Sequence, residues 1–200
     1  MTAHAAPSAH APAAHASDAA GARGRVLLGV RLGILSEVML FGGLFTAYFV
    51  IRAETGGWPP PGQERPELII PALNTLLLVS SSFTMQWAVR SVGHGNLSTM
   101  RRGLLLTIVL GTVFIGIQAY EFATNGFGLS DGVFGSTFYT LTGFHGAHVL
   151  AGLGLLWIVF NRARRGLISA DRHTEVEATS YYWHFVDVVW VFLFSTVYVL

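Results

Sequence analysis

The sequence predicts an all-α fold: a polytopic membrane protein built as a bundle of five transmembrane helices. Two observations lead to this prediction. Hydrophobic residues make up 52% of the 200 residues and charged residues only 12%, whereas soluble domains carry about 25% charged residues. Five stretches are also long and apolar enough to cross a bilayer, because its hydrocarbon core of about 30 Å corresponds to about 20 helical residues.

The first predicted span, residues 32–51, is apolar or small at every position except for one carboxylate, Glu37. Arg31 and Arg52 bracket it closely. An ionised carboxylate near the centre of a bilayer costs about 2.5 kcal/mol or more, so such a group is protonated, paired, or turned toward protein or water. Glu37 is therefore the first candidate functional residue.

The other four predicted spans are long runs with few or no charged residues, separated by polar loops, Gly-rich turns and Arg residues. They cover residues 68–89, 103–120, 133–160 and 181–200.

Residues 1–25 are expected to form a disordered tail, which leaves residues 26–200 as the transmembrane domain. The tail is rich in Ala, Pro and Gly and contains no apolar run that could act as a signal peptide. It also carries His4, His10 and His15. These leave a metal-binding arm as the alternative to a solvated low-complexity segment.

Three Trp residues are candidates for contacts with lipid or with a partner subunit, because Trp is enriched at the membrane–water interface. Trp58 belongs to a Gly- and Pro-rich loop, WPPPG, that cannot be helical. Trp183 and Trp190 belong to the last span, which begins with aromatic residues.

The arrangement of the basic residues predicts the orientation in the membrane. All twelve are Arg, and with five spans and a cytoplasmic N-terminus ten of them lie on the cytoplasmic side. By the positive-inside rule this places the N-terminus in the cytoplasm and the C-terminus on the opposite side of the membrane. Membrane lipids are thus expected partners, whereas nucleic acid is not. The ten are Arg23, Arg25, Arg31, Arg90, Arg101, Arg102, Arg162, Arg164, Arg165 and Arg172.

His145 and His148 lie three residues apart in the fourth span, a spacing that suits a pair of metal or haem ligands. The alternative, which we favour, is that they form hydrogen bonds across helices or with lipid head groups. His148 is about 18 Å below the cytoplasmic end of its span and His184 about 5 Å below its own, so these two cannot share one haem iron. The chain has no Cys, and we expect no metal site.

Glu37 and Asp187 lie about 8 and 9 Å below the cytoplasmic ends of their predicted spans, at the level of His184. We therefore expect Glu37, His184 and Asp187 to form one polar cluster. His184 and Asp187 are three residues apart and face the same way, so they are able to pair. The cluster is interpreted either as a site that handles protons or binds lipid, or as a structural network.

Small residues spaced four apart indicate faces on which helices pack closely. Gly143, Ala147 and Ala151 form such a stripe on the fourth span, and Gly43 and Ala47 form another on the first.

Several motifs in a fixed order resemble subunit III of the haem–copper respiratory oxidases, and cytochrome c oxidase most of all. The resemblance covers residues 26–200. Many members have seven spans; this chain resembles the five-span bacterial form, which lacks the first two. The motifs are SEVM at 36–39, WPP at 58–60, LNT at 73–75, SDGVFGSTF at 130–138, GFHGAHV at 143–149 and YWHFVDVVW at 182–190.

The resemblance implies a non-catalytic accessory subunit of an enzyme complex. It implies that haem and copper belong to the partner subunits I and II, that subunit I is the main contact, and that this chain holds no redox centre. It further implies bound phospholipid and support of proton delivery, with Glu37 at the position of the family's intramembrane Glu.

Three alternatives remain. Quinol oxidases carry a similar subunit III, although the WPPPG loop favours the cytochrome c type. A subunit-III-like protein associated with nitric oxide reductase is the second. The third, from a different class, is a stand-alone proton-coupled transporter that uses Glu37 and Asp187, but the chain has no internal repeat or paired broken helices.

Overall fold

The structure, a computed structural model, describes the backbone of residues 11–60 and 67–200 and the side chains of residues 21–60 and 67–200. Over these residues it contains five long helices and no strand, and each helix is long and apolar enough to cross a membrane. The prediction of an all-α bundle with five spans is confirmed. The elements are α1 (Ala11–Glu54), α2 (Ile69–Gly93), α3 (Leu97–Thr124), α4 (Gly132–Arg164), α5 (Thr174–Phe194) and a terminal π-helical turn, η1 (Ser195–Val199).

α1 is much longer than the predicted span and begins at Ala11. The sequence predicted a disordered tail over residues 1–25; the structure gives residues 11–25 a helical backbone, while residues 1–10 lie outside the described residues. The physical reason is composition. Ala has the highest helix propensity of all residues, and the Ala-rich segment 11–20 extends the transmembrane helix toward the N-terminus.

Each helix extends beyond its predicted apolar span at one end or at both. α4, for example, has 33 residues, which corresponds to about 50 Å of helix and exceeds the hydrocarbon thickness of about 30 Å. The last turns of α1, α2 and α4 carry Arg. At the start of α3 the Asn96 side chain accepts a hydrogen bond from the Thr99 amide at 3.1 Å. Apolar runs therefore located the spans but underestimated the helices.

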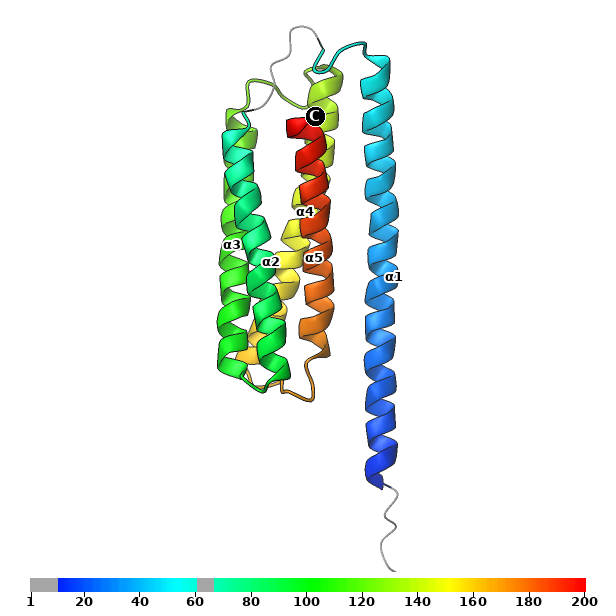
Figure 1. Ribbon diagram of the computed structural model, residues 1–200, viewed down its shortest axis with the longest axis vertical. Coiled ribbons are helices and arrows are strands. Elements are labelled where there is room, and N and C mark those ends of the chain that lie inside the picture. The colour runs from blue at the N-terminus through cyan, green and yellow to red at the C-terminus, as the bar shows by residue number, and fades with distance from the viewer. Residues whose placement is uncertain (1–10, 61–66) are drawn as a thin grey trace, which may run out of the picture.

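Four of the helices, α2 to α5, pack into one unit, and α1 lies outside this unit against α5 and, over a smaller contact, α4. In Figure 1 α1 stands at the edge of the bundle, parallel to α5. We call the end with the turns at 94–96 and 165–173 the basic end. The opposite end, which holds the loop 125–131 and Leu200, is called the carboxyl-terminal end.

Two buried Trp side chains of α5 fill the core of the four-helix unit. Trp183 and Trp190 are both 0% exposed, so the expected contact with lipid or a partner subunit is wrong for them. Their indole nitrogens each donate a hydrogen bond at 2.9 Å to α2, to Ser81 Oγ and to Thr75 Oγ1 respectively. Their position reflects size, since large aromatic side chains contribute most to a core when their N–H groups find partners.

Gly111 of α3 and Gly152 of α4 provide the space for the Trp183 ring. A Cβ atom built on Gly111 would lie 2.7 Å from Trp183 Cη2, and one on Gly152 would lie 2.9 Å from Trp183 Cε3. By contrast, Cβ atoms on Gly43 and Gly143 would meet nothing within 4 Å. The small-residue stripes predicted as packing faces are therefore not used between helices of the described chain.

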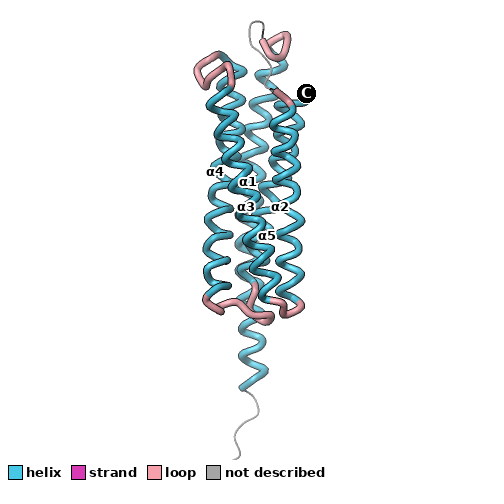
Figure 2. The backbone as a smooth tube through the Cα atoms, turned by 90° about the vertical axis from the view of Figure 1, so that its left-hand side faces the viewer, coloured by secondary structure: helices cyan, strands magenta, loops and turns pink. Residues whose placement is uncertain are grey.

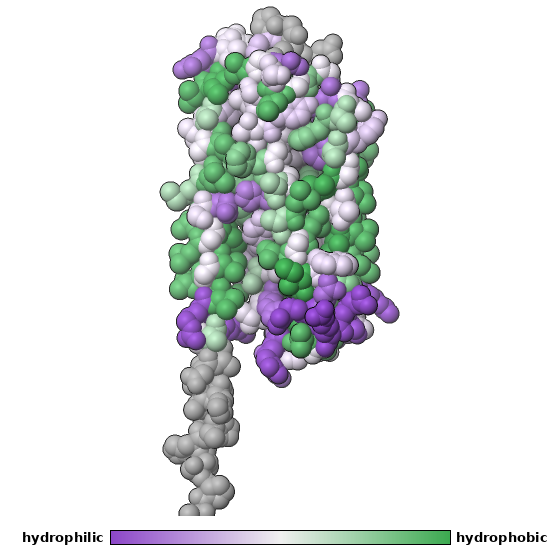
Figure 3. Space-filling view, turned by 180° about the vertical axis from the view of Figure 1, so that it is seen from behind, coloured by the Kyte–Doolittle hydropathy of each residue, from purple (hydrophilic) through white to green (hydrophobic). Residues whose placement is uncertain are grey.

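The surface follows the pattern expected for a membrane protein. Figure 3 shows hydrophobic residues over the middle of one face and hydrophilic residues gathered at the basic end. The apolar middle matches the level at which the five helices would meet lipid.

Candidate functional site

The clearest polar contact within the membrane-spanning region joins α1 to α4. Glu37 Oε2 lies 3.0 Å from His148 Nε2. The Glu37 side chain is 34% exposed and that of His148 15%. Each group thus provides the partner that an intramembrane ionisable side chain requires.

The hydrogen bonds of His148 define what the pair contains. His148 Nδ1 lies 2.7 Å from the carbonyl oxygen of Phe144. A carbonyl only accepts, so Nδ1 carries a hydrogen, and Nε2 of a neutral ring is then an acceptor. Its contact with Glu37 therefore requires one further proton, carried either by the imidazole or by the carboxyl group. In this geometry Glu37 and His148 share one hydrogen across the 3.0 Å contact.

Neighbouring side chains hold His148 in this position. The Phe41 ring packs edge-on against the imidazole, with centroids 4.9 Å apart. The Tyr182 hydroxyl donates to the His148 carbonyl at 3.2 Å. Because these contacts come from α1 and α5, three helices together fix the pair.

The depth argument from the sequence missed this pairing. It placed His148 much deeper than Glu37 because it took the ends of the apolar runs as the ends of the helices. Measured instead from Arg23 and Arg162, which contact neighbouring residues at the start of α5, Glu37 and His148 are each fourteen residues along their helices. Both are then about 21 Å from the basic end.

The expected cluster of Glu37, His184 and Asp187 is wrong in its membership, because Glu37 pairs with His148. His184 and Asp187 do come together, through Ser82 of α2. The Ser82 hydroxyl donates to Asp187 Oδ2 and lies 3.0 Å from His184 Nδ1. Asp187 is 4% exposed, and its Oδ1 has no hydrogen-bond partner among the described residues. A run of three Ser residues within an apolar span was the signal that sequence reasoning passed over.

His145 and His148 do not act as a pair. His145 is 1% exposed and packs between Trp190 and Phe114, with ring centroids at 4.8 and 6.0 Å. His148 instead faces α1. No group of three or more His, Asp or Glu side chains suited to a metal ion occurs within the described part of the chain.

Trp58 is partly buried at the carboxyl-terminal end, which keeps it available as an interface residue. Its ring packs edge-on against Tyr48 of α1 and Phe134 of α4, with centroids 5.3 Å away in both cases. The loop that carries Trp58 thereby joins α1 to the four-helix unit.

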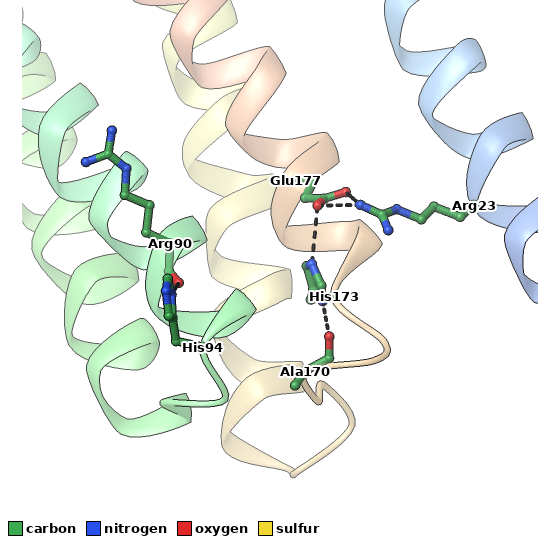
Figure 4. A network of polar contacts seen from close by, with 6 residues as sticks. All are labelled: Arg23, Arg90, His94, Ala170, His173 and Glu177. Carbon is green, nitrogen blue, oxygen red and sulfur yellow. Dashed lines mark hydrogen bonds and ion pairs between the residues drawn. The ribbon is translucent and has the colours of Figure 1, made fainter.

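A network of charged groups attaches α1 to the basic end (Figure 4). Arg23 donates two hydrogen bonds from Nη2 to the Glu177 carboxylate, at 2.7 and 2.8 Å. The same carboxylate lies 3.2 Å from His173 Nε2, and His173 Nδ1 contacts the Ala170 carbonyl. The Arg31 guanidinium adds a cation–π contact with Tyr181 at 5.6 Å. These contacts hold α1 beside α5 and so bring Glu37 to His148.

Comparison with known proteins identifies the chain. The family described as cytochrome c oxidase subunit III matches residues 13–200. The chain belongs to this family. The subunit III resemblance read from the motifs is thus confirmed, and membership implies a complex with other oxidase subunits in the membrane.

Curated cytochrome c oxidase subunit 3 proteins match this subunit III chain over most of its length. The one from Thermostichus vulcanus is 43% identical over 175 residues, which cover 87% of each chain. The one from Synechocystis sp. is 41% identical over 87% of this chain and 75% of its own. The one from Hippopotamus amphibius is 43% identical over 85% of this chain and 67% of its own.

Proposed function

We propose that this chain is the non-catalytic subunit III of a bacterial, proton-translocating cytochrome c oxidase. In this role it stabilises the catalytic subunits, binds phospholipid and supports proton delivery to the oxygen-reducing centre. Haem and copper belong to subunits I and II, and subunit I is the main contact.

The observation that carries the proposal is the Glu37–His148 pair. Its hydrogen-bond pattern requires a proton, and the partly exposed carboxyl leaves that proton within reach of a neighbouring subunit or of water. A pair that only filled a structural role would be expected to be buried, as His145 is. The pair is accordingly proposed to exchange protons during turnover.

The second cluster, formed by Ser82, His184 and Asp187, is also proposed to support proton delivery. Phospholipid is proposed to contact α1, whose apolar side chains are largely exposed: Leu32, Leu35 and Met39 are 58%, 56% and 73% exposed. The basic end is proposed to face the cytoplasm, with the N-terminus there and the C-terminus in the periplasm.

The test uses the oxidase purified through a tag on its catalytic subunit, from cells with and without the gene for this chain. We expect the complete complex to contain the chain and to sustain oxygen consumption with reduced cytochrome c, and the complex without it to lose activity over successive turnovers. Isolated, folded chain is expected to contain no haem and no copper. Stoichiometric haem or copper in that chain, or use of quinol but not cytochrome c, would contradict the proposal.

A further inference from the structure

Buried polar atoms without partners converge in the carboxyl-terminal half of the four-helix unit. Gln118 and Glu121 lie on the buried face of α3 and are 3% and 6% exposed. Gln118 Nε2 donates to Glu121 Oε2 at 3.2 Å. The second oxygen of each side chain, Oε1, has no hydrogen-bond partner among the described residues.

Tyr198 brings a third polar group to the same place from the other side of the unit. Its side chain is buried, and its hydroxyl lies beside Gln118 and Glu121 but has no hydrogen-bond partner within the described residues. Tyr198 belongs to the π-helical turn η1. Single π-helical turns are rare and often occur at functional sites.

The cluster continues toward the middle of the unit. The ring centroids of Tyr198 and Trp190 are 6.4 Å apart, and Trp190 packs on His145. Neither ring nitrogen of His145 has a hydrogen-bond partner in the described chain. Asn74 Nδ2 donates to the Phe114 carbonyl at 3.2 Å, but Asn74 Oδ1 is also without a partner there. We call this set the polar column: Asn74, Gln118, Glu121, His145 and Tyr198.

The chemistry of the polar column selects its ligand. The oxygens of Asn74, Gln118 and Glu121 need donors, whereas the N–H of His145 needs an acceptor. A metal cation satisfies only the oxygens. Water both donates and accepts, and buried waters typically form about three hydrogen bonds to polar groups that would otherwise lack partners.

A bowl at the carboxyl-terminal end is lined in part by Phe122, the residue that follows Glu121 in α3. It has a volume of about 510 Å³ and is lined by the loop around 125–131 together with Tyr139. Asn125, in its wall, donates its backbone N–H to the Glu121 carbonyl, and its buried side-chain Nδ2 has no hydrogen-bond partner among the residues that the structure describes. The wall of the bowl is therefore one helical turn from Glu121.

We propose that the polar column binds a group of internal water molecules, which enter from the bowl and bridge Glu121, Gln118 and Tyr198 toward His145. This inference rests on the four-helix unit alone and does not depend on the function proposed above. It assigns to this half of the subunit a hydrated interior, separate from the Glu37–His148 pair.

The test is hydroxyl-radical labelling of the intact oxidase complex by X-ray radiolysis, read by mass spectrometry. Radicals formed from a bound water modify the side chains beside it. Tyr198 and His145 are expected to be labelled although both are buried. Met85 is the internal control, because its side chain is 0% exposed and its sulfur is more reactive than either ring. Labelling of Tyr198 and His145 that does not exceed that of Met85 would overturn the proposal.

A second measurement uses Tyr198→Phe, with Tyr120→Phe as the matched control because Tyr120 is 60% exposed on the same α3 helix that carries Gln118. In a hydrated column the hydroxyl is hydrogen-bonded, so its removal lowers the temperature at which the subunit leaves the complex. In a dry column the hydroxyl is a buried group without a partner, and its removal raises that temperature. A rise for Tyr198→Phe with no change for Tyr120→Phe would refute the bound water.

Discussion

Replacing Glu37 with Gln separates the proton of the Glu37–His148 pair from its hydrogen bond. Nδ1 of His148 donates to the Phe144 carbonyl, so Nε2 of the neutral ring is an acceptor, and the amide N–H of Gln is a suitable donor to it. The contact of 3.0 Å is therefore retained in Glu37→Gln, while the titratable proton is lost. We expect the free energy of unfolding to change by less than about 1 kcal/mol, and the subunit to assemble normally.

Glu37→Leu, by comparison, removes both the proton and the hydrogen bond. A buried polar group left without a partner costs about 1–3 kcal/mol, and the cost belongs at the lower end here because the Glu37 side chain is 34% exposed and His148 can recruit water. The difference between the Gln and Leu variants thus isolates the structural contribution. Ser36→Ala is the matched control, since Ser36 is exposed and its hydroxyl donates to the Gly33 carbonyl of its own helix.

The assay is oxygen consumption over many turnovers between about pH 6 and about pH 9, with the subunit content of each preparation measured in parallel. If the pair supports proton delivery, Glu37→Gln assembles fully but loses sustained turnover, most strongly at the alkaline end where protons are scarce. Ser36→Ala should match the wild type throughout. A Glu37→Gln complex whose turnover equals that of wild type across this range would refute the proton-related role and leave the pair as a structural contact.

Two further predictions concern packing and topology. Gly111→Ala should destabilise the subunit by about 1–3 kcal/mol, because the added methyl group meets Trp183 at 2.7 Å. Gly116→Ala on the same helix meets nothing within 4 Å, so it should be neutral or stabilising by up to about 1 kcal/mol. Thermal dissociation of the complex measures both variants, and equal effects would contradict the packing argument. A periplasm-active reporter should be active when fused after Leu200 and inactive when fused within 165–173, and the reverse result would contradict the five-span orientation.

The sequence predicted the number and class of the helices because the bilayer imposes a simple rule on composition and length. It did not predict where the helices end, since Ala-rich and Arg-bearing turns extend a helix without being apolar. The misplaced helix ends also led to wrong depths for the residues of the candidate site. Depths counted from the ends of the apolar runs separated Glu37 from His148, whereas depths counted from the ion pairs at the basic end place them at one level.

The direction of side chains around each helix was the second feature that the sequence did not predict. The spacing of His145 and His148 put both on one side of α4, but a helix with neighbours on several sides has no single functional face. α3 and α5 surround His145, and α1 meets His148. Trp183 and Trp190 were expected at the surface for a similar reason: an aromatic residue near a span end is equally suited to the interface and to the core. For Trp183 the core is selected because Gly111, which only the fold brings close, leaves space there for the ring.

The position of α1 links the network at the basic end to the Glu37–His148 pair. Within the described chain α1 packs mainly on α5 and contacts α4 over a smaller area, yet the partner of Glu37 comes from α4. The pair therefore forms only while α1 is held at the correct height and rotation. Arg23 fixes it near one end through Glu177, and Tyr48 fixes it toward the other by donating to the Thr196 carbonyl at 3.1 Å. Because α1 is attached at two points on either side of Glu37, the Glu37 side chain has little freedom to move away from α4. This explains why a partly exposed carboxyl still has a defined partner, His148.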